Sequence, residues 1–384
     1  MRYNNIGANL SFKSADLDSN RLYYNFNLSY DYFTHKKNIF RHRVLTDGLM
    51  AKQVGSFYVG AGVNYELYMP SDSISADNEF IFAISPFLKK STSQWNFKLG
   101  LELLRDRTGT FRAYPDINFG FTIVPSFINF FASLDGYLER NDPTKIIGVN
   151  PYLYNRYYYN PISNSTTYAS ALFALPDTDH ELVITAGLKG SNGIGGKYLI
   201  SASYSMIKNM LHYISVVRYN SGGLINPLPP EFGNYFMPSF YVGNILNVHG
   251  EISGKITNRV SFTGNANFYD YNIDDKPWNK PTFDAKFGLN YNLRDKILAG
   301  AELTTIGKRT NAIFTHLNYG GMFFGFDEIK EPVHFNLNLR AEYRYTKILS
   351  FWTKLNNVSF NDYYEWAFYP TYRFMFMAGF TYSL

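Results

Sequence analysis

His249 and Glu251 stand two residues apart, a spacing that could place two metal ligands side by side on one face of a strand. The seven histidines are otherwise scattered, and neither HExxH nor a two-His-one-carboxylate pattern occurs. The sequence contains no cysteine, which excludes thiolate metal sites and disulfides. We therefore expect a simple polar pair at this position, with no metal and no cofactor.

Motifs for phosphate binding and for nucleophilic catalysis each lack a required part. Residues 190–196, GSNGIGG, are glycine-rich, but a phosphate-binding loop leads into a helix, and the following KYLISASYS alternates as a strand. We read this segment as a turn. No GxSxG sequence is present, and no Ser or Asp/His pair stands out as a nucleophile with its base. The sequence therefore predicts that the protein is not an enzyme.

Three segments, 150–168, 222–238 and 318–328, are rich in aromatic residues, Asn, Gly or Pro. Side chains of this kind bind glycans or hydrophobic chelates by stacking and by several hydrogen bonds at once. The alternative is that these loops only form the aromatic rim of the protein. The candidate ligand-binding residues are Tyr152, Tyr154, Arg156, Tyr157, Tyr159, Phe232 and Tyr235.

Charged residues also recur along the polar faces of the expected strands. In a sheet that closes on itself they would line the lumen and offer a path to a solute. They could equally form ion pairs between neighbouring strands that brace the wall. The candidate lumen-lining residues are Lys98, Glu102, His249, Glu251, Lys286, Arg294, Arg340, Glu342 and Arg344.

The elements that carry these residues are predicted from a period-2 alternation that runs through almost the whole chain. The segment 283–294, FDAKFGLNYNLR, alternates large apolar residues with polar ones, and the C-terminal segment YRFMFMAGFTYSL places Phe and Tyr on one parity. Side chains two residues apart share one face of a strand, so each strand has an apolar face and a polar face. Helical spacing is almost absent. The protein is therefore predicted to be all-β.

The connections between the strands fall into a short and a long family that largely alternate. The short ones are 15–20, 89–94, 124–127, 190–196, 255–260, 293–297 and 345–349, and the long ones are 141–178, 219–237, 274–281, 309–332 and 359–370. Long alternating strands with short turns at one rim are typical of an outer-membrane β-barrel, the only sheet that leaves no backbone group unpaired in hydrocarbon. We predict a transmembrane antiparallel up-and-down β-barrel of roughly 16–18 strands that forms one domain, 1–384.

Our count is about 17 strands, but single-chain bacterial barrels usually have an even number. With an odd number, the first and last strands would run in parallel. Either the count is wrong by one, or at least one strand that should precede residue 1 is absent.

Composition supports the membrane prediction. Aromatic residues make up 18% of the chain and charged residues 17%, against about 25% charged residues in soluble domains. The net charge of +5 is mild and its basic residues are dispersed, which argues against nucleic acid as a partner. No apolar run approaches the length of a membrane helix, and residue 1 leads directly into a strand pattern without a signal peptide. We expect an exported chain that has been trimmed.

The C-terminal third resembles the barrel of TonB-dependent outer-membrane receptors of the Bacteroidetes type. The segments that carry the resemblance are LNVHGEISGKI (246–256), NYNLRDKILAGAEL (290–303) with IGKR (306–309), LNLRAEYRYTKILSFWTKLNNV (337–358) and YYEWAFYPTYRFMFMAGFTYSL (363–384). The chain ends in Leu384, where the family more often has Phe. The resemblance covers the barrel part only, since no plug-like segment is found in the chain.

The resemblance implies a transporter in the bacterial outer membrane that passes a bulky solute through its lumen. Loops would capture the solute and a plug would gate the path. The implied partners are outer-membrane lipid and possible further chains, namely a plug domain, a lipoprotein or a TonB-type periplasmic protein. The alternatives are a plugless passive channel and a structural barrel subunit of an outer-membrane complex.

Overall fold

The computed structural model describes residues 3–14, 22–35, 39–70, 78–153, 155–160, 165–170, 175–193, 195–219, 235–319 and 321–383. All structural statements below concern these residues. They form one large sheet of nineteen strands, two small two-stranded sheets and one short helix. None of the described helical residues makes a helix that is long and apolar enough to cross a membrane.

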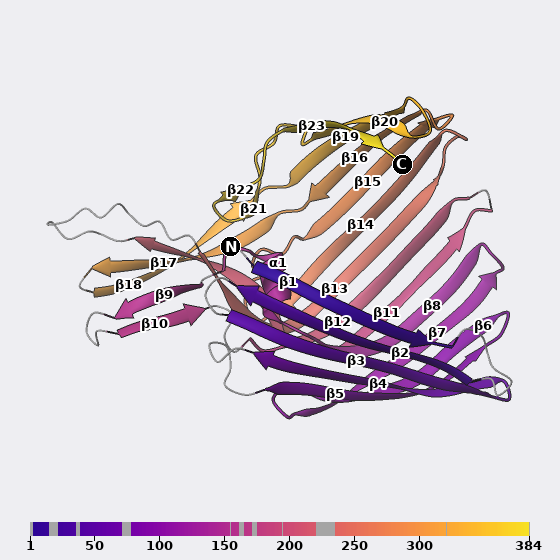
Figure 1. Cartoon of the computed structure of the whole chain (residues 1–384), viewed down its shortest axis with the longest axis horizontal. Helices are drawn as coiled ribbons and strands as arrows, with labels where there is room; N and C mark the ends of the chain where they lie inside the picture. The colour runs from indigo at the N-terminus through magenta and orange to yellow at the C-terminus, as the bar shows by residue number, and fades with distance from the viewer. Residues whose placement is uncertain are drawn as a thin grey trace.

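Seventeen of the nineteen strands, all except β17 and β18, follow one another in an antiparallel meander that curves around a central space (Figure 1). The first eight are β1 (Tyr3–Lys13), β2 (Leu22–His35), β3 (Ile39–Val54), β4 (Phe57–Pro70), β5 (Glu79–Ser91), β6 (Trp95–Arg105), β7 (Phe111–Val124) and β8 (Ile128–Glu139). The other nine are β11 (Thr178–Ser191), β12 (Lys197–Tyr219), β13 (Tyr235–Lys255), β14 (Val260–Ile273), β15 (Phe283–Leu293), β16 (Ile297–Ile306), β19 (His334–Arg344), β20 (Leu349–Asn356) and β23 (Met375–Tyr382). The predicted up-and-down all-β architecture is confirmed.

The remaining elements lie within the long connections. These are α1 (Pro143–Val149), β9 (Asn155–Asn160), β10 (Ser165–Ser170), β17 (Arg309–Tyr319), β18 (Gly321–Glu331), β21 (Tyr364–Trp366) and β22 (Tyr369–Pro370). The segment 309–332, predicted only as a long connection, is instead the hairpin β17–β18, and β17 pairs in parallel with the end of β12 from Ser215 to Tyr219. Figure 1 shows the long connections at one end of the sheet, here called the long-loop end, and the short ones at the tight-turn end.

Pairing in register keeps the two faces of the sheet chemically distinct. Phe287 lies opposite Gly264 on one neighbouring strand and Leu303 on the other, whereas Lys286 lies opposite Asn265 and Thr304. If one strand slipped by one residue, its apolar side chains would move to the polar face of the sheet. On the apolar parity, large side chains are exposed along the sheet, for example Ile6 at 67%, Leu99 at 54% and Phe380 at 68%. An apolar band of this extent requires an apolar medium or partner.

The predicted tight turns are present wherever the structure describes them. In the turn between β15 and β16, Arg294 and Asp295 have φ of 54° and 57°. Two successive positive φ angles give the turn a twist that matches the strands it joins. Asn292 stabilises the turn, since its Oδ1 accepts a hydrogen bond from the Asp295 amide at 2.8 Å.

Arg294 is consequently placed differently from the prediction. It was expected to line the lumen on a strand face, but it lies in this exposed turn beyond the end of β15. The alternation at 283–293 ends at Leu293, because the backbone reverses at residue 294.

The tight-turn end contains a close backbone approach at Gly190. A Cβ atom at this position would clash with the carbonyl oxygen of Phe127, and backbone cannot move aside as a side chain can. We expect Gly190→Ala to cost about 1–3 kcal/mol of unfolding free energy, measured by denaturant titration of the folded protein in lipid. Gly250→Ala is the matched control, because no atom lies within 4 Å of its added Cβ. Equal stability of the two variants would contradict this reading.

The seventeen-strand meander has two end strands that each pair on one side only. Among the described residues, β1 pairs only with β2, and β23 pairs only with β20. An even number of antiparallel pairings separates the two edges, so β1 and β23 run in the same direction. The parallel ends expected from the sequence are therefore observed.

Candidate functional site

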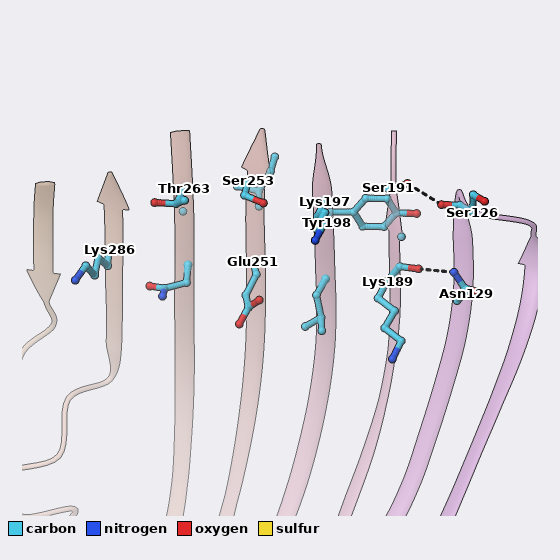
Figure 2. Close-up of a pocket in the computed structure, with 15 residues that line it drawn as sticks. Ser126, Asn129, Lys189, Ser191, Lys197, Tyr198, Glu251, Ser253, Thr263 and Lys286 are labelled. Carbon is cyan, nitrogen blue, oxygen red and sulfur yellow. Dashed lines mark hydrogen bonds between the residues drawn. The ribbon is translucent and has the colours of Figure 1, made fainter. Parts of the chain in front are cut away.

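The polar face of the sheet is its inner face. Arg41 on β3 and Glu66 on β4 belong to this parity, and both contact the segment after β8, which lies inside the curve of the sheet. Towards the tight-turn end, the inner wall has a concavity of about 660 Å³ between β8 and β15. Figure 2 shows Lys189, Glu251 and Lys286 projecting from separate strands over this wall. The wall is polar and charged along its length.

Four of the charged or polar residues predicted to line the lumen, Lys98, Glu102, His249 and Lys286, have polar partners on neighbouring strands. Lys286 Nζ lies 2.9 Å from Glu302 Oε2, and Lys98 pairs with Asp116. Ser85 Oγ donates a hydrogen bond to Glu102 at 3.3 Å. These contacts agree with the bracing role considered for this face. A role in lining a solute path remains a prediction.

The remaining lumen candidates form similar local contacts. His249 Nε2 lies 3.0 Å from Glu251 Oε1, and its Nδ1 lies 2.7 Å from Asn267 Oδ1. Both ring nitrogens are thus engaged, which makes this the polar pair expected from the sequence. Arg340 Nη2 donates to Asn290 Oδ1 at 2.6 Å, and Arg344 Nε donates to Glu342 Oε1 at 3.0 Å.

The predicted ligand-binding loop residues are only partly within the described chain. Tyr152 is described, and its ring stacks on that of Tyr369 with centroids 3.6 Å apart. Tyr235 begins β13 and is partly buried. The structure describes the backbone but not the side chains of Arg156, Tyr157 and Tyr159 on β9, and Tyr154 and Phe232 lie outside the described residues.

The most informative feature of the long-loop end is the segment 140–153, here called the bridge. It leaves β8 and forms α1, where the Asp142 side chain accepts a hydrogen bond from the Lys145 amide at 3.2 Å in the manner of an N-cap. Its end then joins β13, where the Phe236 amide donates to the Tyr152 carbonyl at 3.0 Å.

Apolar packing fixes the bridge from several sides. Ile146 and Ile147 are at most 1% exposed. The apolar cluster around them comprises Phe33 on β2, Leu153, Leu175, Tyr213 on β12, Phe236 on β13, and Trp366 and Ala367 from the β20–β23 connection. These strands lie near the beginning, in the middle and near the end of the sheet. The bridge therefore crosses the mouth of the curved sheet and does not lie along its rim.

Ion pairs attach the start of the bridge to the wall. Asp142 Oδ1 lies 3.0 Å from Arg41 Nη1, and Arg140 pairs with Glu66. Arg43 Nε lies 2.6 Å from Asp31 Oδ2, and Arg43 Nη1 lies 3.4 Å from Glu66 Oε1. The side chains of Arg41 and Glu66 are only 2% and 5% exposed. We call these six residues the Arg41 network: Asp31, Arg41, Arg43, Glu66, Arg140 and Asp142.

Neither the bridge nor the Arg41 network stands out in the amino-acid sequence. The partial signals were Asp142-Pro143, a helix-start pattern, and charges on the polar parity near the strand ends at the long loops. These signals could have predicted a short helix in the 141–178 connection. They could not have predicted which wall the helix contacts, because Arg41 and Asp142 are separated by about a hundred residues.

No protein-family model and no curated protein matches the sequence. Solved structures do match, and the fold of this chain is similar to that of TonB-dependent receptor barrels. A variant of the ferric enterobactin receptor of Pseudomonas aeruginosa superimposes with a TM-score of 0.62 at 12% identity, over 94% of this chain and 57% of that chain.

Two further structures show the same relationship. The copper transporter OprC superimposes with a TM-score of 0.61 at 14% identity, over 100% of this chain and 65% of that chain. The siderophore receptor PirA from Acinetobacter baumannii superimposes with a TM-score of 0.66 at 9% identity, over 100% of this chain and 62% of that chain. The chain thus spans about three-fifths of the length of these proteins. At such identities the similarity establishes the fold alone.

Proposed function

We propose that this chain forms the wall of an outer-membrane transport barrel that passes a bulky solute through its lumen. The observation that carries the proposal is a sheet with an apolar outer face and a polar inner face, whose mouth is crossed by the bridge. A segment fixed across the entrance narrows the path, which favours a gated transporter over a wide, permanently open pore. The similar solved structures support the proposal, since they are a ferric enterobactin receptor, a siderophore receptor and a copper transporter.

The proposed transport mechanism assigns a different role to the long-loop end and to the tight-turn end of the sheet. Loops at the long-loop end, with Tyr152 and Tyr235 among the described residues, would capture the solute. The polar inner wall would then pass it towards the tight-turn end. The partners in this proposal are outer-membrane lipid, a plug within the lumen and a TonB-type periplasmic protein.

The two sheet edges bear on the domain organisation. Residues 1–384 would belong to a single barrel domain, whose closure in hydrocarbon requires the backbone groups of β1 and β23 to be paired. Because β1 and β23 run in the same direction, antiparallel closure requires an odd number of further strands. A second copy in the same membrane orientation presents edges of that same direction, and so it cannot supply an antiparallel partner. This observation also favours the structural-subunit alternative, in which a different chain pairs with the edges.

Single-channel recording of the native full-length protein tests the transport proposal. We expect little conductance in the unaltered protein, and a severalfold rise in protein prepared without the plug when the bridge is released by Arg41→Ala. A large, permanent conductance in the unaltered protein would instead establish a passive channel. Purification in a fixed ratio with a second barrel or a lipoprotein, with no conductance in either variant, would establish a structural subunit.

A further inference from the structure

A cavity of about 430 Å³ lies between the bridge and the inner faces of β8 and β11–β14. Its volume is in the range of small-molecule sites. Much of its lining is apolar or aromatic, including Val149, Ile207, Tyr213, Tyr269 and Tyr271. Its polar groups are concentrated around Glu139, Lys145, His180 and Lys280.

Glu139 is already bound by two of these groups. Its Oε1 lies 2.6 Å from Lys145 Nζ, and its Oε2 lies 3.1 Å from His180 Nε2. Both carboxylate oxygens are therefore occupied. Lys145 also donates to the Arg140 carbonyl at 3.2 Å, which fixes its ammonium at the edge of the cavity.

Lys280 has no such partner. The connection between β14 and β15 carries it into the cavity lining, where the Lys280 amide donates to the Pro277 carbonyl at 3.1 Å. Among the described residues, no carboxylate lies within ion-pair distance of its ammonium. Burial lowers the pKa of Lys280, and the neighbouring Lys145 lowers it further, while Glu139 raises it. The cavity thus contains two ammonium groups and one carboxylate.

We propose that this cavity binds a small amphiphilic anion, with its carboxylate on Lys280 and its apolar body against the tyrosines and aliphatic side chains. Lys280 is partly buried in the cavity lining, and a ligand carboxylate would supply an ionic partner for its ammonium. The apolar lining explains why a carboxylate with an apolar or aromatic body is preferred over a free inorganic ion. The inference rests on the proposed function in one respect, since it identifies the chemical class of solute that the mouth would capture.

Fluorine NMR titration of the native full-length protein in detergent tests the proposal with a matched pair of probes. Trifluoromethylbenzoate carries the anionic group, and trifluoromethylbenzamide is its neutral counterpart. We expect saturable binding of the benzoate, about tenfold tighter than binding of the benzamide. Lys280→Gln should weaken benzoate binding about tenfold and leave the benzamide unchanged, whereas Lys280→Arg should retain most of the benzoate affinity.

Lys276→Gln is the matched control, because Lys276 lies in the same connection but pairs with Glu328 and has a 55% exposed side chain. It should leave the binding of both probes unchanged. Equal affinity for the two probes, or undiminished benzoate binding by a Lys280→Gln variant that shows the heat-modified gel mobility of a folded barrel, would overturn the anion site. Neither outcome alters the conductance expected of the Arg41→Ala variant, so failure of this site is distinguishable from failure of the transport proposal.

Discussion

Replacement of Val248 by Arg is expected to destabilise the folded protein in lipid by roughly 2–4 kcal/mol. Val248 lies in the middle of β13, 40% exposed, and is paired with Ala202 and Phe268 on the apolar face. An arginine on that face would have to remain in hydrocarbon or reach along the surface to water. The measurement is a guanidinium titration of the protein folded into short-chain phosphatidylcholine vesicles.

Asn247→Arg provides the control, because the adjacent residue points to the opposite face of the same strand. Asn247 Nδ2 donates to the Phe268 carbonyl at 3.3 Å, and the loss of this contact should cost about 1 kcal/mol. The long arginine side chain would extend into the polar interior. If the two variants were equally stable, or if Asn247→Arg were the worse one, the assignment of the apolar face to lipid would be wrong.

Replacement of Arg41 by Ala is expected to release the bridge at a cost of about 3 kcal/mol. The substitution leaves the carboxylates of Asp31 and Asp142, with side chains 15% and 12% exposed, short of a positive charge. We place the cost at the low end of the range for broken buried pairs, because Arg43 still lies 2.6 Å from Asp31. Amide hydrogen exchange at Ile146 and Asn150, whose amides donate within the bridge, should accelerate about a hundredfold.

Lys208→Ala is the control for this variant. Lys208 pairs with Glu181, but the two side chains are 52% and 39% exposed, so the pair should contribute no more than about 1 kcal/mol. Exchange at Ile146 should then remain at the level of the unaltered protein. Unchanged exchange in Arg41→Ala would show that apolar packing alone retains the bridge.

Local sequence predicted most of the wall. The alternation of residues 283–294 assigns each side chain to the inner or the outer face, and the structure retains that assignment up to Leu293. The same rule predicted the final strand, whose Phe376 and Phe380 are exposed on the outer face. A β-strand has a fixed period of two residues, so its faces can be assigned from neighbouring positions alone. The turn at 190–196 was also predicted, since a strand rather than a helix follows it.

Predictions from local sequence were wrong where the backbone departs from the two-residue period of a strand. Arg294 was assigned to the lumen because it continues the alternation, but two positive φ angles turn the chain at that residue. The hairpin β17–β18 was predicted as a loop, and its parallel pairing with β12 depends on a strand about a hundred residues earlier in the sequence. No period within either segment specifies that pairing.

The sequence by itself therefore determined the wall: its strands, its two faces and the parallel direction of its edges. Only the tertiary structure decided what lies across the mouth. The bridge gains its stability from Phe33, Tyr213 and Trp366, which lie far apart in the chain and converge only because the sheet curves. Burial of apolar area and pairing of charges depend on distances in space, and alternation along a strand contains no information about those distances.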